Sequence, residues 1–159
     1  CDEFEGNARG MDTARNFPTT FCSRKKIHQQ PASENETRAL IRIFQEYGGR
    51  GLLVFCGYGK KVVYYRRDQN FSTGQRCYRL ARHLKKCTRG KLEQLAIERE
   101  AQNGRRSTGR PEQYYGEMIR QPAFRIELPV NSGNKEEEER EIRDLMLLPL
   151  EYIYSLVQL

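Results

Sequence analysis

The stretch Leu52–Arg67, "LLVFCGYGKKVVYYRR", decides the fold of this 159-residue chain. Two runs rich in β-branched and aromatic residues, Leu52–Cys56 and Lys61–Arg67, flank a short segment that contains two glycines. Such runs favour strands, and a short glycine-containing connection between them favours a β-hairpin. Because the first run is entirely apolar, we expect it to lie at the centre of a small sheet.

Helical patterns lie on both sides of this stretch. Residues 33–49 predict one helix, and residues 72–104 predict one or two helices with Gly90 as a joint. In the second pattern five side chains fall on one apolar stripe: Cys77, Leu80, Ala81, Leu84 and Thr88. The basic side chains lie mostly on the opposite side, so this stripe is expected to face the core.

The remaining segments complete an α+β plan. Residues 123–130 alternate as a strand, and residues 134–156 predict a helix kinked before Pro149. We therefore expect a small antiparallel sheet with a hairpin, packed against two to four helices. Residues 1–33 are predicted to be an irregular N-terminal arm and residues 34–159 a single domain, with an exposed loop near 104–113.

The chain is basic, and its positive charge is concentrated. It has 28 Lys and Arg residues against 21 Asp and Glu residues, a net charge of +7. Between Lys60 and Lys91 the only acidic residue is Asp68. A focused positive charge attracts polyanions, which include nucleic acids, acidic proteins and anionic membranes.

A basic hairpin and helix with interleaved tyrosines predict nucleic-acid binding, because Lys and Arg pair with phosphates and tyrosine rings stack on bases. RNA or a single strand is favoured slightly over duplex DNA. The predicted contact residues are Lys60, Lys61, Tyr64, Tyr65, Arg66, Arg67, Arg76, Arg79, Arg82, Lys85, Lys86 and Arg89. The alternative is a protein-interaction module, stabilised by zinc, whose basic face docks an acidic protein partner. A solvated basic face without a ligand is the plainest interpretation.

The two histidines of the chain each lie near a cysteine. Cys22 precedes His28 by six residues, and His83 and Cys87 have the i, i+4 spacing that places both on one side of a helix. These four residues could complete a tetrahedral zinc site, and Cys56 or Cys77 could replace either residue of the first pair. Zinc is thus a candidate cofactor, although Cys56 and Cys77 also suit the apolar core.

No catalytic motif stands out, so the sequence predicts a non-enzymatic domain. A Cys87–His83 nucleophile pair for a hydrolase, and the carboxylates Asp68, Glu117 and Glu127 for a metal-dependent nuclease, are the alternatives. The spacing of these residues selects neither.

The apolar C-terminal segment, "LMLLPLEYIYSLVQL", is expected either to pack on the sheet or to form a homo-oligomer contact. No run approaches the length of a membrane span. Five widely spaced cysteines without a CxxC pair favour a reducing compartment, hence an intracellular, nuclear or cytoplasmic location, with secretion as the alternative.

Overall fold

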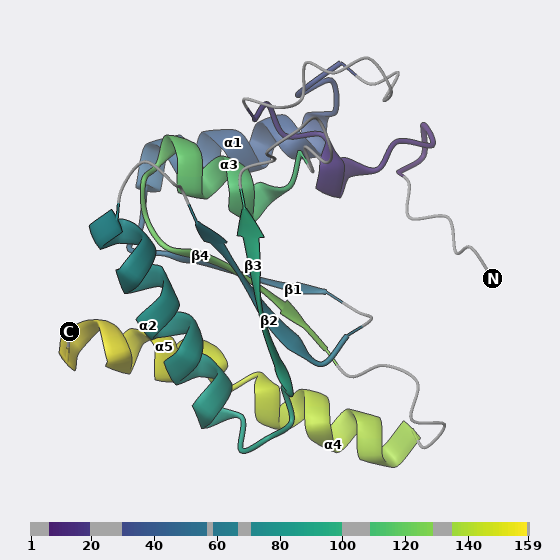
Figure 1. Cartoon of the computed structure of the whole chain (residues 1–159). Helices are drawn as coiled ribbons and strands as arrows, with labels where there is room; N and C mark the ends of the chain where they lie inside the picture. Colours follow the sequence, from purple (N-terminus) through teal and green to yellow (C-terminus); the bar gives the residue numbers. More distant parts are fainter. Residues whose placement is uncertain are drawn as a thin grey trace.

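A four-stranded mixed sheet forms the centre of the chain in the computed structural model (Figure 1). The structure describes residues 7–19, 30–56, 59–66, 71–99, 109–128 and 135–158. The strands are β1 (Leu52–Cys56), β2 (Lys61–Arg66), β3 (Gln94–Arg99) and β4 (Ala123–Glu127), in the order β1-β4-β2-β3. A small sheet covered by helices confirms the predicted α+β class.

The strand pairing differs from the predicted hairpin. β4 lies between β1 and β2, parallel to β1 and antiparallel to β2, so the sheet is mixed and β1 does not pair with β2. All five residues of β4 are buried, and the strand is hydrogen-bonded along both edges. A hairpin pattern describes only the local turn and contains no information about a strand from the far end of the chain.

The second helical pattern is shorter than predicted. α2 (Phe71–Cys87) ends before Arg89 and Gly90, both of which have left-handed backbone conformations with φ of 51° and 90°. A left-handed glycine just beyond the last turn is a common helix stop. The chain then enters β3, which pairs in parallel with β2. Parallel neighbours need a crossover connection, and α2 provides it.

One face of the sheet packs against α2 and α5 (Leu148–Gln158) (Figure 1). The predicted stripe of α2 is confirmed, because Cys77, Leu80, Ala81, Leu84 and Thr88 are all buried. Strand residues of alternating register complete this core: Val62, Tyr64, Phe124 and Ile126. Tyr152 of α5 closes it, with its ring 5.7 Å from that of Phe124.

The opposite face packs against α3 (Pro111–Met118) and α1 (Asn35–Tyr47), which Figure 1 shows together on one side of the sheet. Its apolar cluster consists of Phe17, Phe44, Tyr114, Tyr115 and Ala123. Phe17 follows the short helix η1 (Thr13–Arg15) and stacks on Phe44 at 6.2 Å between ring centroids. The division of the chain into an arm and a domain at residue 33 stays a prediction.

The predicted kinked helix is divided into α4 (Lys135–Leu145) and α5 by a two-residue turn before Pro149. Leu145, Leu148 and Tyr152 are buried, whereas Leu150 and Val157 remain exposed. Residues 104–108 of the predicted exposed loop at 104–113 fall outside the described residues, and its last three residues form the first turn of α3, where Glu112 and Gln113 are buried. In the part of the chain that the structure describes, no helix is both long enough and apolar enough to cross a membrane.

Candidate functional site

A row of polar side chains crosses the sheet where β1 and β4 end. Cys56 is the register partner of Glu127, and Glu127 is the register partner of Lys61 at the start of β2. Lys61 Nζ lies 3.1 Å from Glu127 Oε2. Register partners share one face of a sheet, so all three side chains lie on the side that α3 covers. We call this row, with the buried ion pairs described next, the strand-end cluster.

Arg125 connects the row to α3 through two ion pairs. Its Nε lies 3.0 Å from Glu127 Oε1, and its Nη1 lies 2.5 Å from Glu112 Oε1. Arg125, Glu112 and Glu127 are 9%, 1% and 8% exposed. Charged side chains are rarely buried to this extent unless they are paired. Two acidic and two basic groups thus meet beneath α3, close to the ends of β1 and β4.

The thiol of Cys56 lies within the field of this cluster. Burial raises its pKa above the ordinary value, the guanidinium of Arg125 opposes that rise, and the carboxylate of Glu127 adds to it. Arg110, the half-buried N-cap residue of α3, stands two residues before Glu112, and its charge also lowers the thiol pKa. Among the described residues, no carboxylate forms an ion pair with Arg110.

Sequence reasoning missed most of this cluster. Glu127 was considered only as a nuclease carboxylate, and Glu112, Arg125 and Arg110 were not selected. The alternation of side chains along β4 could have indicated it. Phe124 and Ile126 face one core, so Arg125 and Glu127 lie together on the other face of the strand. Only the packing of α3 shows that this other face is also buried.

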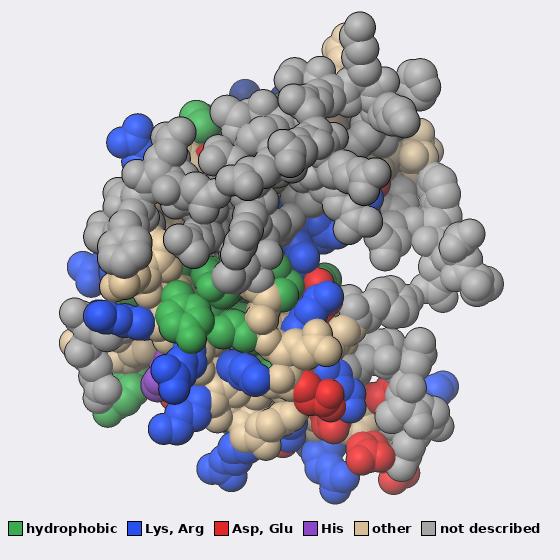
Figure 2. Space-filling model, viewed as in Figure 1, with side chains coloured by type: hydrophobic (Ala, Val, Ile, Leu, Met, Phe, Trp, Pro, Cys, Tyr) green, Lys and Arg blue, Asp and Glu red, His purple; other side chains and the backbone are tan. Residues whose placement is uncertain are grey.

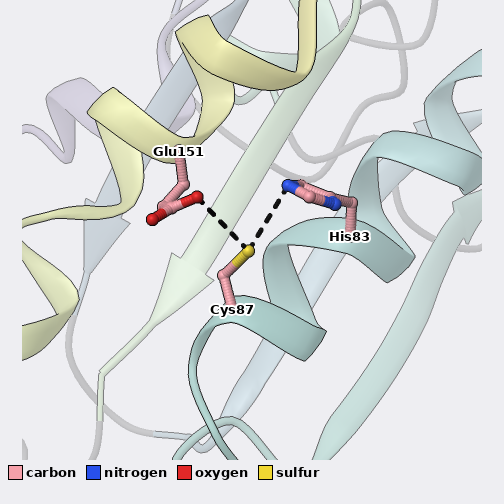
Figure 3. Close-up of side chains that lie close together, drawn as sticks. All are labelled: His83, Cys87 and Glu151. Atoms are coloured by element: carbon pink, nitrogen blue, oxygen red, sulfur yellow. Dashed lines mark hydrogen bonds between the residues drawn. The ribbon is translucent and has the colours of Figure 1, made fainter. Parts of the chain in front are cut away.

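A second group of titratable side chains lies between α2 and α5 (Figure 3). Cys87 Sγ lies 3.4 Å from His83 Nε2 and 3.7 Å from Glu151 Oε2. The donor atoms of all three residues lie within 4.8 Å of one another. We call these residues the HCE group. The predicted i, i+4 pair therefore lies as expected on one side of α2, and Glu151 of α5 is a member that the sequence did not indicate.

The other predicted zinc ligands lie elsewhere. Cys22 and His28 fall outside the described residues. Cys77 is buried in the core, where burial raises its pKa to about 11. Cys56 belongs to the strand-end cluster, on the far face of the sheet. Among the described residues, neither of these cysteines lies close enough to His83 and Cys87 to share a metal ion with them. The donors of the HCE group are nevertheless of types that zinc accepts. Zinc is therefore compatible with this chain.

The HCE group borders a cleft of about 250 Å³. Cys87 and Glu151 line it, together with Lys91 and Asp144, which form an ion pair. Burial raises the pKa of the Cys87 thiol, and the carboxylate of Glu151 raises it further. The thiol is therefore a weak nucleophile here, which argues against a Cys87–His83 hydrolase pair.

The predicted nucleic-acid contacts are dispersed. Tyr64 is 2% exposed and belongs to the core, Lys60 pairs with Glu93 across 3.7 Å, and Lys61 pairs with Glu127. Lys85 is half-buried, whereas the other predicted contacts on α2 are exposed: Arg76, Arg79, Arg82, Lys86 and Arg89. Arg67 and the side chains of Tyr65 and Arg66 lie outside the described residues. Figure 2 shows Lys and Arg side chains scattered among apolar and polar ones on the described part of this face.

Solved structures provide the comparisons for this fold. No protein-family model matches the chain, and no curated protein does. Bovine thrombin-activatable fibrinolysis inhibitor in complex with tick carboxypeptidase inhibitor is similar with a TM-score of 0.69 and 14% identity, over 94% of this chain and 57% of that one. A crystal structure of thrombin activatable fibrinolysis inhibitor is similar with a TM-score of 0.72 and 15% identity, over 94% and 42%. Carboxypeptidase A from Helicoverpa armigera is similar with a TM-score of 0.66 and 15% identity, over 89% and 41%.

At these identities the likeness shows the fold alone, which is carboxypeptidase-like, and this chain spans about half the length of those solved chains. The finding overturns the prediction of an RNA- or DNA-binding domain, since the solved structures that the fold resembles are carboxypeptidase-like. It does not support the alternative of a basic face that docks an acidic protein either. The fold is one that enzymes use, so it offers no support for the predicted absence of activity.

Proposed function

We propose that this chain binds the carboxyl-terminal end of a peptide at the strand-end cluster. The observation that carries the proposal is the row Cys56–Glu127–Lys61 at the carboxyl ends of two parallel strands in a carboxypeptidase-like fold, with Arg110 two residues before Glu112 of the same cluster. In open sheets that contain parallel strands, ligands bind beyond these strand ends. The name carboxypeptidase A supports a peptide carboxyl terminus as the ligand.

Arg110 is the cation proposed to receive the peptide carboxylate. Arg125 forms ion pairs with Glu112 and Glu127, and Lys61 forms an ion pair with Glu127. Arg110 is half-buried at the edge of the cluster and forms no ion pair with a described carboxylate. A guanidinium binds a carboxylate through two parallel hydrogen bonds, which gives both affinity and orientation. Glu127 pairs with both Lys61 and Arg125, so its carboxylate leaves Arg110 as the cation available to the peptide.

Binding without hydrolysis is the form of the function that we propose. Metal-assisted hydrolysis needs three protein ligands around the metal and an open position for water. The donor set of the strand-end cluster does not fit this need, because Arg125 and Lys61 occupy the Glu127 carboxylate. The described residues bring no three metal donors within 4.8 Å of one another there.

The test compares two fluorescent peptides of identical sequence, one with a free carboxyl terminus and one amidated. The full chain should bind the free form about 10- to 100-fold more tightly, as expected for a charge-assisted hydrogen-bonded pair. Arg110→Gln should remove this preference, and Arg110→Lys should restore part of it. Arg82→Gln, which removes an exposed cation of α2 on the opposite face of the sheet, is the matched control and should bind like the wild type.

Equal affinity for the two peptides would refute the proposal. Mass spectrometry of the same peptides after incubation tests the second part of it. Release of the terminal residue by the wild type, abolished in Glu127→Gln, would show that the chain is an enzyme and would overturn the claim of binding without hydrolysis.

An intracellular location, nuclear or cytoplasmic, is retained as a proposal. It is supported by the free thiols of the described cysteines, Cys56, Cys77 and Cys87, which suit a reducing compartment.

A further inference from the structure

We propose that the HCE group is a Zn²⁺ site that links α2 to α5. The site lies across the sheet from the strand-end cluster, and the inference does not rest on the proposed peptide binding. Three residue types that zinc accepts, a histidine, a cysteine and a glutamate, point toward one another in Figure 3. His83 and Cys87 come from consecutive turns of α2, and Glu151 comes from the first turn of α5.

The two distances from the Cys87 sulfur fit a tetrahedral ion. With Zn–S of about 2.3 Å and Zn–N or Zn–O of about 2.0–2.1 Å, tetrahedral angles place the sulfur about 3.5 Å from the nitrogen and from the oxygen. The observed separations are 3.4 Å from Cys87 Sγ to His83 Nε2 and 3.7 Å from Cys87 Sγ to Glu151 Oε2. The third separation, between the donor atoms of His83 and Glu151, is within 4.8 Å, against about 3.3 Å around such an ion, so these two side chains close on the metal when it binds.

Packing between the two helices holds the donors in this arrangement. Leu80 and Leu84 of α2 share a core with Leu148 and Tyr152 of α5, and all four are buried. Ligands carried on packed helices keep their geometry better than ligands on loops. Because the site joins two elements that are far apart in the sequence, bound metal should stabilise their contact.

The cleft supplies the remaining coordination position. Cys87 and Glu151 line both the proposed site and the cleft of about 250 Å³. Three protein ligands and one position open to water form an established zinc pattern. Asp144 faces the same cleft but is engaged by Lys91, so water is the fourth ligand that we assign.

The donor chemistry selects zinc over the common hard cations. A thiolate and an imidazole are poor ligands for Mg²⁺ and Ca²⁺, which prefer oxygen. On binding, the Cys87 thiol loses its proton to the buffer, and the new Zn–S bond replaces the S–H bond. No oxidant or reductant takes part. The charges of the thiolate and of Glu151 balance the double positive charge of the ion.

The experiment uses the full chain, kept reduced and stripped of metal by a chelator. Titration with Zn²⁺ in a calorimeter should show one site whose occupation releases protons and raises the melting temperature. Co²⁺ used as a spectroscopic probe should give a thiolate-to-cobalt charge-transfer band. Cys87→Ser should abolish this band, and Cys87→Ser, His83→Gln and Glu151→Gln should each weaken Zn²⁺ binding by more than about 100-fold, since changes to outer groups of metal sites already cost 10- to 100-fold.

The chain offers matched controls in its other histidine and in a cysteine of the predicted arm. His28→Gln and Cys22→Ser should leave the affinity and the cobalt band unchanged. If they weaken binding while Glu151→Gln does not, the four-residue set predicted from the sequence holds the metal and the assignment of Glu151 is wrong. Absence of binding at micromolar Zn²⁺ by the folded wild type would overturn the proposal. Circular dichroism checks that each variant is folded. If a cysteine variant unfolds, Glu151→Gln still tests the proposal, because it removes only a charge.

Discussion

Replacement of Arg125 by methionine tests whether the buried ion pairs stabilise the fold. Methionine retains much of the length and apolar surface of arginine but removes the charge that joins Glu112 to Glu127. Glu112 is 1% exposed and Glu127 is 8% exposed, so water cannot take the place of the lost guanidinium. Glu127 still has Lys61 at 3.1 Å, and the main loss therefore falls on the Glu112 side.

Removal of one partner from a buried ion pair typically costs about 3–5 kcal/mol, because the remaining charge stays buried without compensation. We expect Arg125→Met to lower the free energy of unfolding by this amount, against a total of about 5–15 kcal/mol for an ordinary domain. In urea the unfolding midpoint should fall by more than about 1 M. Methionine in place of Arg125 together with Glu112→Leu should recover part of the loss, since the pair is then replaced by apolar groups.

Urea unfolding at neutral pH, followed by circular dichroism, measures these changes. Lys60→Met is the control: Lys60 pairs with Glu93 across 3.7 Å, and both side chains are at least half exposed, so its removal should cost less than about 1 kcal/mol. If Arg125→Met costs no more than this control, the cluster does not stabilise the fold and the reasoning is refuted.

Two further predictions concern buried groups of the α2 and α5 core. Burial raises the pKa of Cys77 from 9.0 to about 11. Between these values the unfolded chain loses the thiol proton while the folded chain keeps it, so stability is full below pH 9 and falls by about 2 kcal/mol as the pH rises to 11. The difference in unfolding free energy between the wild type and Cys77→Ala should shrink by this amount over that range, and a constant difference would contradict the burial argument. Tyr152→Phe removes the hydrogen bond donated to the Arg50 carbonyl at 3.1 Å but keeps the ring contact with Phe124, so it should cost about 1 kcal/mol in urea unfolding. A loss above about 3 kcal/mol would mean that the hydroxyl does more than this one bond.

The sequence predictions succeeded where the interacting residues are close together in the sequence and failed where they are far apart. The stripe of α2 was predictable because helical periodicity depends on neighbours three and four residues apart, and burial of Leu80 and Leu84 needs only some apolar surface opposite. β3 was missed because Gln94–Arg99 has helix-forming residues. Its strand conformation comes from pairing with β2, which overrides local propensity.

The HCE group likewise has one part that the sequence predicts and one part that only the fold brings in. The i, i+4 spacing of His83 and Cys87 placed both side chains together without knowledge of the fold. Glu151, 64 residues beyond Cys87, joins them only because α5 packs on α2. No local pattern marks this glutamate among the many acidic residues of the chain.

By itself, the sequence determined the α+β class, the apolar faces of its helices and the His83–Cys87 pair, since each depends on residues a few positions apart. The tertiary structure alone decided that β4 enters between β1 and β2 and that α3 covers its polar face. These contacts join segments separated by tens of residues, and their free energy comes from burial that no single segment can provide. This placement of β4 beneath α3 buries Arg125 and Glu127 at the centre of the strand-end cluster, whereas on a sheet with one open face both side chains would face water.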